Sequence, residues 1–353
     1  MVMKGFGFLS FGHYGSGRGP GDPNARQSLR DAVEIAEGAD ELGVNGAYFR
    51  VHHYARQSAS PMPLLSAIAA RTRNIEVGTG VIDMRYENPL YFAEEAAQLD
   101  LLADGRVALG VSRGSPEPAL RGWESFGYTG SEDPRGADIA REHFEKFMRA
   151  IKGEAMTYAD PAQYGAGATL AIEPQSPGLP ERIWWGAGSA KTAEWAGEQG
   201  VNLMSSTLLT EANEGSFAEQ QAEQVRRFRE AFRAAGHTRT PRTSVSRSVF
   251  PIVGPEDEIF SYMGARESRD QVGVIDGFTS IFGRAYAGSP DSLVEQLKQD
   301  QAVMESDTLM LTIPSQLGPE LNLRILENFA TYVAPELGWR PNTDGPVTGY
   351  EMS

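Results

Sequence analysis

Two hydroxyl side chains and two glycines lie close together in segment 181–196, in an order that could bind a phosphate. An apolar run rich in β-forming residues leads to Gly186 and Gly188, and good helix formers follow Ser189, a favoured N-cap residue. Thr192 lies three residues later, on the same side of the first helical turn. A helix N-terminus carries roughly half a positive charge, and small residues let a ligand oxygen approach the backbone. The segment therefore predicts a phosphate cradle; the alternative is an ordinary strand-to-helix turn capped by Ser189.

Arg113 is a second candidate for phosphate binding, because it directly follows the apolar run 107–112. A guanidinium offers a planar, permanently charged fork that matches a phosphate group. If the strand before Arg113 lies beside the strand before Ser189, the two could hold the same phosphate. The alternative is a salt bridge at the rim of the protein.

The adjacent pair His52-His53 ends another apolar run, 45–51. Neighbouring residues of a strand point to opposite faces, so the pair is not expected to bind a metal ion jointly. One histidine facing a site could move a proton near neutral pH. We expect this residue to be His52, with a structural hydrogen-bonding role as the alternative, and His13 is a second candidate.

Composition excludes several other kinds of chemistry. The chain has 353 residues, 41% of them hydrophobic and 22% charged, and no cysteine. The lack of cysteine removes disulfides, thiolate nucleophiles and cysteine-bound metal centres. A net charge of −15 argues against nucleic acid or an anionic membrane as a partner. The first residues predict a buried strand rather than a secretory signal, and no apolar run approaches the ~18 residues of a membrane helix. A cytoplasmic enzyme is expected, whose redox chemistry would come from a bound cofactor.

Strand-like and helix-like segments alternate along the whole chain, which is typical of parallel strands joined by helical crossovers. Eight such units predict a single (β/α)₈ barrel over residues 1–353, with insertions at about 114–138, 153–180 and 254–289. The alternative is an open doubly wound sheet, but the chain lacks the early glycine fingerprint of that fold. The predicted strands are 4–11, 45–53, 74–83, 106–113, 181–188, 201–206, 243–253 and 308–313, and the predicted helices include 28–42, 61–71, 89–102, 139–152, 217–235 and 321–333.

In such a barrel the active site lies at the carboxyl ends of the strands. The predicted strand ends are rich in small residues, as a site for a large flat ligand approached by backbone requires. Gly78 and Gly80 interrupt one strand and indicate a close approach by a ligand or by backbone. Trp184 and Trp185 are expected to pack on opposite faces of their strand rather than stack on a ligand.

Two stretches of the chain resemble the bacterial luciferase-like flavin monooxygenases. They are VHHYARQSASPMPLLSAIAARTRNIEVGTGVIDMRYENPLYFAEEAAQLDLLADGRVALGVSRG and GAGSAKTAEWA. The resemblance extends in order over nearly the whole chain, and the family fold is a (β/α)₈ barrel.

The resemblance implies an enzyme that binds reduced flavin mononucleotide (FMN) at the barrel top and uses O₂ to oxidise a small organic substrate. It implies a non-proline cis peptide at Gly80-Val81 beside the flavin, and a catalytic role for His52. The implied cofactor-binding residues are Val51, Thr79, Gly80, Val81, Ser112, Arg113, Gly186, Ala187, Gly188, Ser189 and Thr192, with no metal ligand.

Three positions depart from the luciferase pattern. The reactive cysteine of luciferase corresponds to Ser112, and two of its acidic residues correspond to Val51 and Gly188. These departures argue against light emission and against the aldehyde substrate of luciferase.

The resemblance also implies partners. A separate flavin reductase would supply the reduced flavin, and helices 61–71 and 89–102 would form the face of a homodimer. A deazaflavin-dependent dehydrogenase of the same superfamily and a non-catalytic flavin-binding protein are the alternative functions. Segment 254–289 is expected to be either a lid over the flavin or passive surface decoration.

Overall fold

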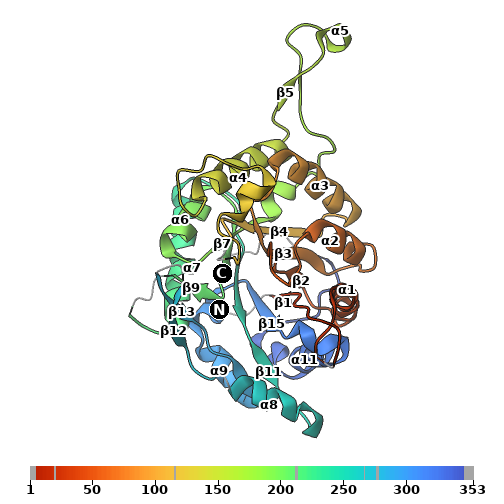
Figure 1. The fold of residues 1–353 in the computed structure, drawn as a ribbon. Coiled ribbons are helices and arrows are strands. Elements are labelled where there is room, and N and C mark those ends of the chain that lie inside the picture. Colours follow the sequence, from red (N-terminus) through yellow and green to blue (C-terminus); the bar gives the residue numbers. More distant parts are fainter. Residues whose placement is uncertain are drawn as a thin grey trace.

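Eight parallel strands close into a barrel in the computed structural model, which describes residues 5–19, 21–114, 117–210, 214–265, 267–275 and 278–345. Following the barrel wall, the order is β1, β2, β3, β4, β7, β8, β10 and β15, and β15 pairs back onto β1 (Figure 1). The predicted (β/α)₈ barrel is therefore confirmed. The barrel strands are β1 (Gly5–Ser10), β2 (Gly46–Phe49), β3 (Glu76–Asp83), β4 (Val107–Ser112), β7 (Ile183–Ala187), β8 (Asn202–Ser205), β10 (Thr243–Arg247) and β15 (Thr308–Ile313).

Helices cover the outside of the barrel, and local capping decides where they begin. The first starts at Ala25, three residues before the predicted Ser28, because the Asn24 side chain accepts a hydrogen bond from the Gln27 amide at 3.0 Å. The helices are α1 (Ala25–Glu41), α2 (Pro61–Ala69), α3 (Pro89–Leu102), α4 (Ala137–Ile151), α6 (Ala190–Glu198), α7 (Phe217–Ala234), α9 (Pro290–Gln299), α10 (Gln301–Glu305) and α11 (Gly318–Tyr332), with 3₁₀ turns at Gly122–Phe126, Leu179–Arg182, Pro255–Asp257, Ser315–Leu317 and Ala334–Leu337.

The seventh barrel strand is shorter than the predicted segment 243–253. It ends at Arg247, and Val249–Pro251 forms a separate strand, β11, that pairs with β14 (Tyr286–Gly288) outside the barrel. The Arg247 side chain is buried against Asp300, with its Nε donating to a carboxylate oxygen at 2.8 Å. The single long strand was therefore a wrong prediction, because the chain leaves the barrel wall after Arg247.

Two layers of apolar side chains hold the barrel together. The outer layer packs the strands against the helices and includes Trp185. The ring centroid of Trp185 lies 4.6 Å from that of Trp195. The inner layer fills the barrel, and Trp184 belongs to it. The two tryptophans thus face opposite ways, as predicted. The inner layer consists of Leu9, Tyr48, Ala108, Trp184, Met204 and Met310, with Phe11 and Val81 packed on it.

A buried ion pair closes the amino end of the barrel. Both guanidinium nitrogens of Arg242 donate to the two carboxylate oxygens of Glu76, and the Tyr48 hydroxyl donates to the same carboxylate at 2.9 Å. The Arg242 guanidinium also lies 4.8 Å from the Trp184 ring centroid. In the described part of the chain, these contacts fill the amino end of the barrel interior.

Two of the segments predicted as insertions contain secondary structure outside the barrel wall. Residues 153–180 include an antiparallel hairpin, β5 (Thr157–Tyr158) and β6 (Thr169–Leu170), whose tip holds α5 (Pro161–Tyr164) and which stands away from the barrel (Figure 1). Residues 254–289 contain α8 (Glu258–Ala265), β12 (Gln271–Ile275), β13 (Phe278–Phe282) and β14. Strand β13 pairs with β9 (Leu208–Leu209), which follows barrel strand β8, so this insertion lies at the carboxyl end of the barrel.

None of the helices formed by these described residues is long and apolar enough to cross a membrane.

Candidate active site

The carboxyl ends of β3, β4 and β7 form a crowded surface on which only small residues fit. A Cβ atom added to Gly186 would lie 3.0 Å from Val81 Cγ1 and 3.5 Å from Ser112 Cβ. A Cβ added to Gly110 would lie 2.4 Å from the Thr79 carbonyl oxygen. We call the surface formed by Gly80, Val81, Ser112 and Gly186 the platform. Its residues come from three neighbouring strands, and a Cβ on Gly80 would lie 2.7 Å from Leu9 Cδ1.

The peptide bond between Gly80 and Val81 is cis, as the family resemblance implied. The register between β3 and β4 shifts at the same place, between Thr79 and Ile82. Thr79 is fully buried, and its hydroxyl donates to the Gly110 carbonyl at 2.8 Å. Its side chain therefore joins two strands, which leaves only the Thr79 backbone for a cofactor.

The segment that follows β7 has the predicted geometry of an anion-binding turn, and we call residues 186–192 the cradle. Ser189 is the N-cap of α6, and its Oγ accepts a hydrogen bond from the Thr192 amide at 3.2 Å. The Ser189 hydroxyl also donates to Thr192 Oγ1 at 2.9 Å. Both side chains are half-buried. The nine-residue α6 thus directs its first amides, flanked by two hydroxyls, toward one spot.

A second loop supports the cradle from behind. The Gly188 carbonyl accepts hydrogen bonds from the Thr210 amide at 2.8 Å and from the Thr210 hydroxyl at 3.2 Å, and the Ser206 amide donates to the Ala187 carbonyl at 3.0 Å. Thr210 follows β9, which pairs with the 254–289 insertion. The segment from β9 to Thr210 therefore contacts both the 254–289 insertion and the cradle.

Arg113 directly follows β4, the barrel strand that neighbours β7. Strand β4 pairs with β7 so that Leu109 faces Ile183 and Val111 faces Trp185. Arg113 is the residue after the end of β4, and a continuation of this register by two residues would bring it level with Ala187. Burial and the nearby positive charges of Arg135 and Arg85 lower the pKa of the Arg113 guanidinium.

Among the described residues, none forms a hydrogen bond or an ion pair with the Arg113 guanidinium. Asp133 and Asp83 are near enough to oppose this lowering of the pKa. A half-buried guanidinium without an ion pair to a described residue is nevertheless suited to an anionic ligand. The alternative role for Arg113, a rim salt bridge, is not observed in the described part of the chain.

The two histidines have different surroundings. His53 stacks on Tyr86 with 4.0 Å between ring centroids, and its backbone amide donates to the Glu117 carboxylate at 3.1 Å. His52 is 7% exposed, and its backbone amide donates to the Ser58 carbonyl at 2.9 Å. Burial, with the positive charges of Arg50 and the neighbouring histidines, lowers the pKa of His52 to about 4. His52 is therefore neutral at pH 7, and its ring can accept a proton.

His13 and Arg50 lie near His52. The His13 ring stacks on Phe11 at 5.6 Å between centroids, and its Nε2 is 2.8 Å from Gln57 Nε2. The Arg50 guanidinium lies 4.7 Å from the Phe11 ring centroid, and burial lowers the pKa of Arg50 to about 10. The sequence prediction missed Arg50. Its position two residues after Tyr48, which faces the barrel interior, was the available signal, because alternate residues share a face.

Val51 lies on the opposite face from Arg50 and His52. Its side chain is 4% exposed and belongs to the outer apolar layer between strands and helices. A cofactor at the barrel mouth could therefore meet Val51 only through its backbone.

A buried acid at the end of β3 was also missed. The Asp83 carboxylate accepts from Arg85 Nε at 2.9 Å, and Gly114 covers it so closely that a Cβ there would lie 2.0 Å from Asp83 Oδ2. Burial raises the pKa of the Asp83 carboxyl to about 6, against the opposing effect of Arg85. The pair lies beside the strand end that carries Arg113 and fixes the turn after it. Among the described residues there is no cluster of three or more His, Asp or Glu side chains that could hold a metal ion.

The chain matches proteins of known activity. Residues 6–261 match the model of a family described as luciferase-like monooxygenase. The chain is 25% identical over 189 residues to the oxygenase component of the flavin-dependent trigonelline monooxygenase of Acinetobacter baylyi, a match that covers 52% of this chain and 50% of that protein. It is 26% identical over 219 residues to the F420-dependent glucose-6-phosphate dehydrogenase of Amycolatopsis mediterranei, covering 56% of this chain and 63% of the relative. The chain thus spans about half to two thirds of the length of these relatives.

A solved structure has the same fold. The oxygenating constituent of 3,6-diketocamphane monooxygenase from Pseudomonas putida, in complex with FMN, superimposes with a TM-score of 0.66 at 19% identity, covering 95% of this chain and 99% of that chain. The barrel, the platform and the match over residues 6–261 lead to one conclusion. The chain is a member of the luciferase-like monooxygenase family of oxidoreductases.

Proposed function

We propose that this protein is the oxygenase of a two-component system, which uses reduced FMN and O₂ to oxidise a small organic substrate. The observation that carries the proposal is the position of Arg113. A guanidinium without a partner among the described residues lies beside a capped helix start, so that one phosphate could accept from both.

Each part of the candidate site has a role in this proposal. The cradle amides, the hydroxyls of Ser189 and Thr192 and the guanidinium of Arg113 would hold the phosphate. The platform would support the flat ring system, because larger side chains at Gly80 and Gly186 would meet neighbouring atoms. Reduced FMN, when bound, supplies the electrons with which one atom of O₂ enters the substrate and the other leaves as water.

His52 is the proposed catalytic residue. Its ring is neutral at physiological pH because burial and nearby positive charges lower its pKa to about 4. A neutral imidazole can accept a proton from the substrate or from a water molecule and return it. The family likeness of the His52-His53 pair supports this assignment.

A flavin reductase is the proposed partner that supplies reduced FMN. The support is the name of the trigonelline relative, which is the oxygenase component of a larger system. The proposal is tested by adding reduced FMN to the protein in aerated buffer and screening organic compounds for substrate-dependent oxygen uptake. Uptake coupled to oxygen incorporation supports an oxygenase. Tight flavin binding without any such coupling across the screen would favour a non-catalytic flavin-binding protein.

A second candidate function is a deazaflavin-dependent dehydrogenase, and the F420-dependent relative supports it. The cradle and Arg113 would hold a phosphate in that case as well. The two functions differ in their use of oxygen, because a dehydrogenase transfers a hydride to the deazaflavin and consumes no O₂. Anaerobic reduction of the deazaflavin by an alcohol or sugar phosphate would favour this candidate.

We also propose that the protein is a homodimer built on α2 and α3. Helix α2 has no charged residue between Pro61 and Ala70, yet Pro63, Ala67 and Ala70 are exposed. A helix that is apolar all round is normally buried. On α3, Tyr91 is 69% and Leu102 is 70% exposed. The two faces together form a surface suited to a second copy.

A further inference from the structure

The arm, defined as residues 157–170, has no core of its own. All of its residues except Ala159 and Ala168 are exposed, with Tyr158 at 80% and Tyr164 at 60%. It contains two two-residue strands and a four-residue helix. An isolated two-stranded hairpin is at best marginally stable in water, so packing against a further surface would stabilise the arm.

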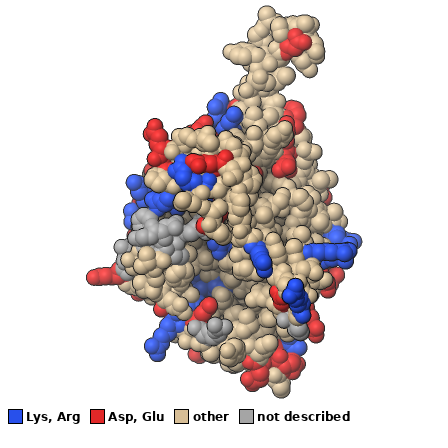
Figure 2. Space-filling model, viewed as in Figure 1, with Lys and Arg blue, Asp and Glu red and all other residues tan. Residues whose placement is uncertain are grey.

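The composition of the arm is suited to contact with another protein surface. Its sequence, TYADPAQYGAGATL, has one charged residue, Asp160. Figure 2 shows the arm standing clear of the molecule, with acidic atoms near its tip and no basic atoms. The flanking residues Glu154 and Glu173 are acidic as well, and no lysine or arginine occurs between residues 153 and 181.

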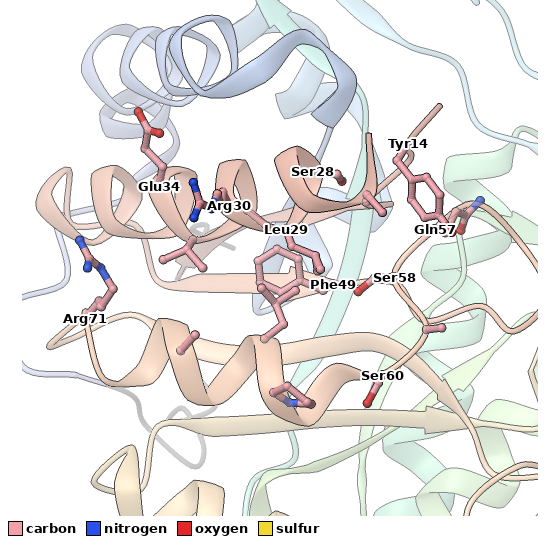
Figure 3. A pocket seen from close by; sticks show the side chains of 18 of the residues that line it. Tyr14, Ser28, Leu29, Arg30, Glu34, Phe49, Gln57, Ser58, Ser60 and Arg71 are labelled. Carbon is pink, nitrogen blue, oxygen red and sulfur yellow. The ribbon is translucent and has the colours of Figure 1, made fainter. Parts of the chain in front are cut away.

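An apolar groove lies elsewhere on the same chain, between α1 and α2. It has a volume of about 850 Å³ and is lined by Leu29, Val33, Pro63, Leu64 and Ala67, among others. Leu29 is 47% exposed in it. Figure 3 shows the groove running between the two helices, with Arg71 at one end and Tyr14 and Gln57 at the other. Arg30 lies on its rim, is exposed, and forms no ion pair with any described residue.

We propose that the arm of one copy occupies the α1–α2 groove of a second copy of this chain. The inference rests on the proposed dimer and extends it. Around the barrel, α1 packs on α2, α2 on α3 and α3 on α4, and the arm leaves the barrel between α3 and α4 (Figure 1). Consider a two-fold dimer whose axis runs parallel to α2 and α3. On the facing copy, the helices α1 to α4 then follow one another in the opposite direction. Each arm then lies opposite the partner's α1–α2 side.

The other two-fold arrangement, with the axis across the helices, places arm against arm. It would bring two acidic hairpins together and leave both grooves empty. Like charges in contact are destabilising, whereas the groove carries both signs of charge, with Arg30 and Arg71 beside Glu34 and Glu37. The repulsion between two acidic arms and the apolar lining of the groove therefore both favour the groove.

The arrangement connects dimer formation with the active site. Tyr14 and Gln57 lie at one end of the groove, and Gln57 contacts His13 at 2.8 Å. Ser58 lines the same end and accepts the hydrogen bond from the His52 amide. A docked arm would thus contact the two loops that position His13 and His52. Each copy would in this way stabilise the loops at the carboxyl end of the other copy's barrel.

Cysteine crosslinking tests this contact directly, because the natural chain has no cysteine to interfere. Ala162→Cys on the arm and Ala67→Cys in the groove are made in separate full-length proteins, which are mixed and mildly oxidised. Random exchange of subunits puts about half of the protein into mixed dimers, and we expect most of these to form a reducible covalent dimer. The matched control pairs Ala162→Cys with Glu295→Cys on α9, on the other side of the barrel, and should give little crosslinking. Crosslinking no greater than in this control, or mainly between two Ala162→Cys chains, would overturn the proposal.

A second measurement does not depend on thiol geometry. Tyr158→Ser combined with Tyr164→Ser removes two side chains that touch nothing in the monomer core, so the fold should be unaffected. The dimer dissociation constant from sedimentation equilibrium should rise at least ten-fold, and an unchanged constant would contradict the proposal. Neither measurement uses flavin, so each result stands whether or not FMN binds.

Discussion

Gly186 on β7 and Val81 on β3 lie so close together at the barrel mouth that a Cβ on Gly186 would be 3.0 Å from Val81 Cγ1. The contact joins the two strands that flank β4, and it places the start of the cradle against the cis peptide at Gly80-Val81. The flat surface and the phosphate-binding turn are therefore two parts of one site.

Gly186→Val should weaken FMN binding at least ten-fold, which corresponds to about 1.4 kcal/mol. The added side chain would displace Val81 and project from the platform. Gly19→Val is the matched control, since a Cβ at Gly19 would meet no atom within 4 Å. The dissociation constants are measured by flavin fluorescence. Equal FMN affinities for the two variants would show that the flavin does not bind on the platform.

Arg113→Ala should weaken FMN binding by about 1.5–3 kcal/mol, the usual scale for hydrogen bonds to a charged group. Riboflavin, which lacks the phosphate, should bind the variant and the natural protein equally. Arg149→Ala, at an exposed ion pair with Glu154 on α4, is the control and should bind FMN normally. A parallel loss of riboflavin binding in Arg113→Ala would show that Arg113 does not act through the phosphate.

His52→Ala should leave flavin binding within about two-fold and lower turnover on the order of 10²-fold, the lower range for loss of a general acid or base. The measurement is a comparison of kcat with the flavin dissociation constant, using the substrate found by the oxygen-uptake screen. Normal turnover would show that the histidine is structural.

The stability of the protein should depend on the protonation of His52. Its pKa is about 4 when folded, against 6.5 for an unperturbed histidine, so the unfolded chain binds the proton more tightly. The stabilising contribution of neutral His52 is complete above about pH 6.5 and is lost as the pH falls toward 4. Urea unfolding of the natural protein and of His52→Gln at pH 4.5, 5.5 and 7 isolates this contribution. We expect the stability difference between the two to change with pH; a constant difference would contradict the low pKa.

Glu76→Gln should destabilise the protein by about 3–5 kcal/mol, because it leaves the Arg242 charge buried without its partner. Glu154→Gln, at the exposed pair with Arg149, should change stability by less than about 1 kcal/mol. Both are measured by denaturant unfolding. A small effect at Glu76 would mean that water reaches the amino end of the barrel.

The alternation of apolar strands and capped helices was sufficient to predict the barrel and the position of the cradle, because both are encoded locally. Ser189 caps α6 through the side-chain contact that its sequence position indicated. The cis peptide at Gly80-Val81 was predicted only by resemblance, since no local pattern requires it.

Other features depend on barrel closure and could not be predicted in the same way. The inward positions of Arg50 and Asp83 follow from strand register, which is set by pairing between segments distant in sequence. The end of β10 at Arg247 depends on Asp300, 53 residues away. The arm lacks any helical or strand periodicity long enough to detect, and its exposure became evident only in three dimensions.

The most direct measurement is an equilibrium titration of the purified protein with reduced FMN, oxidised FMN and the deazaflavin in parallel. The account predicts that reduced FMN binds more tightly than both other ligands, as a two-component oxygenase requires. Binding of the deazaflavin alone would contradict the proposed function and favour the dehydrogenase. Binding of none of the three would contradict the assignment of the cradle and the platform as a cofactor site.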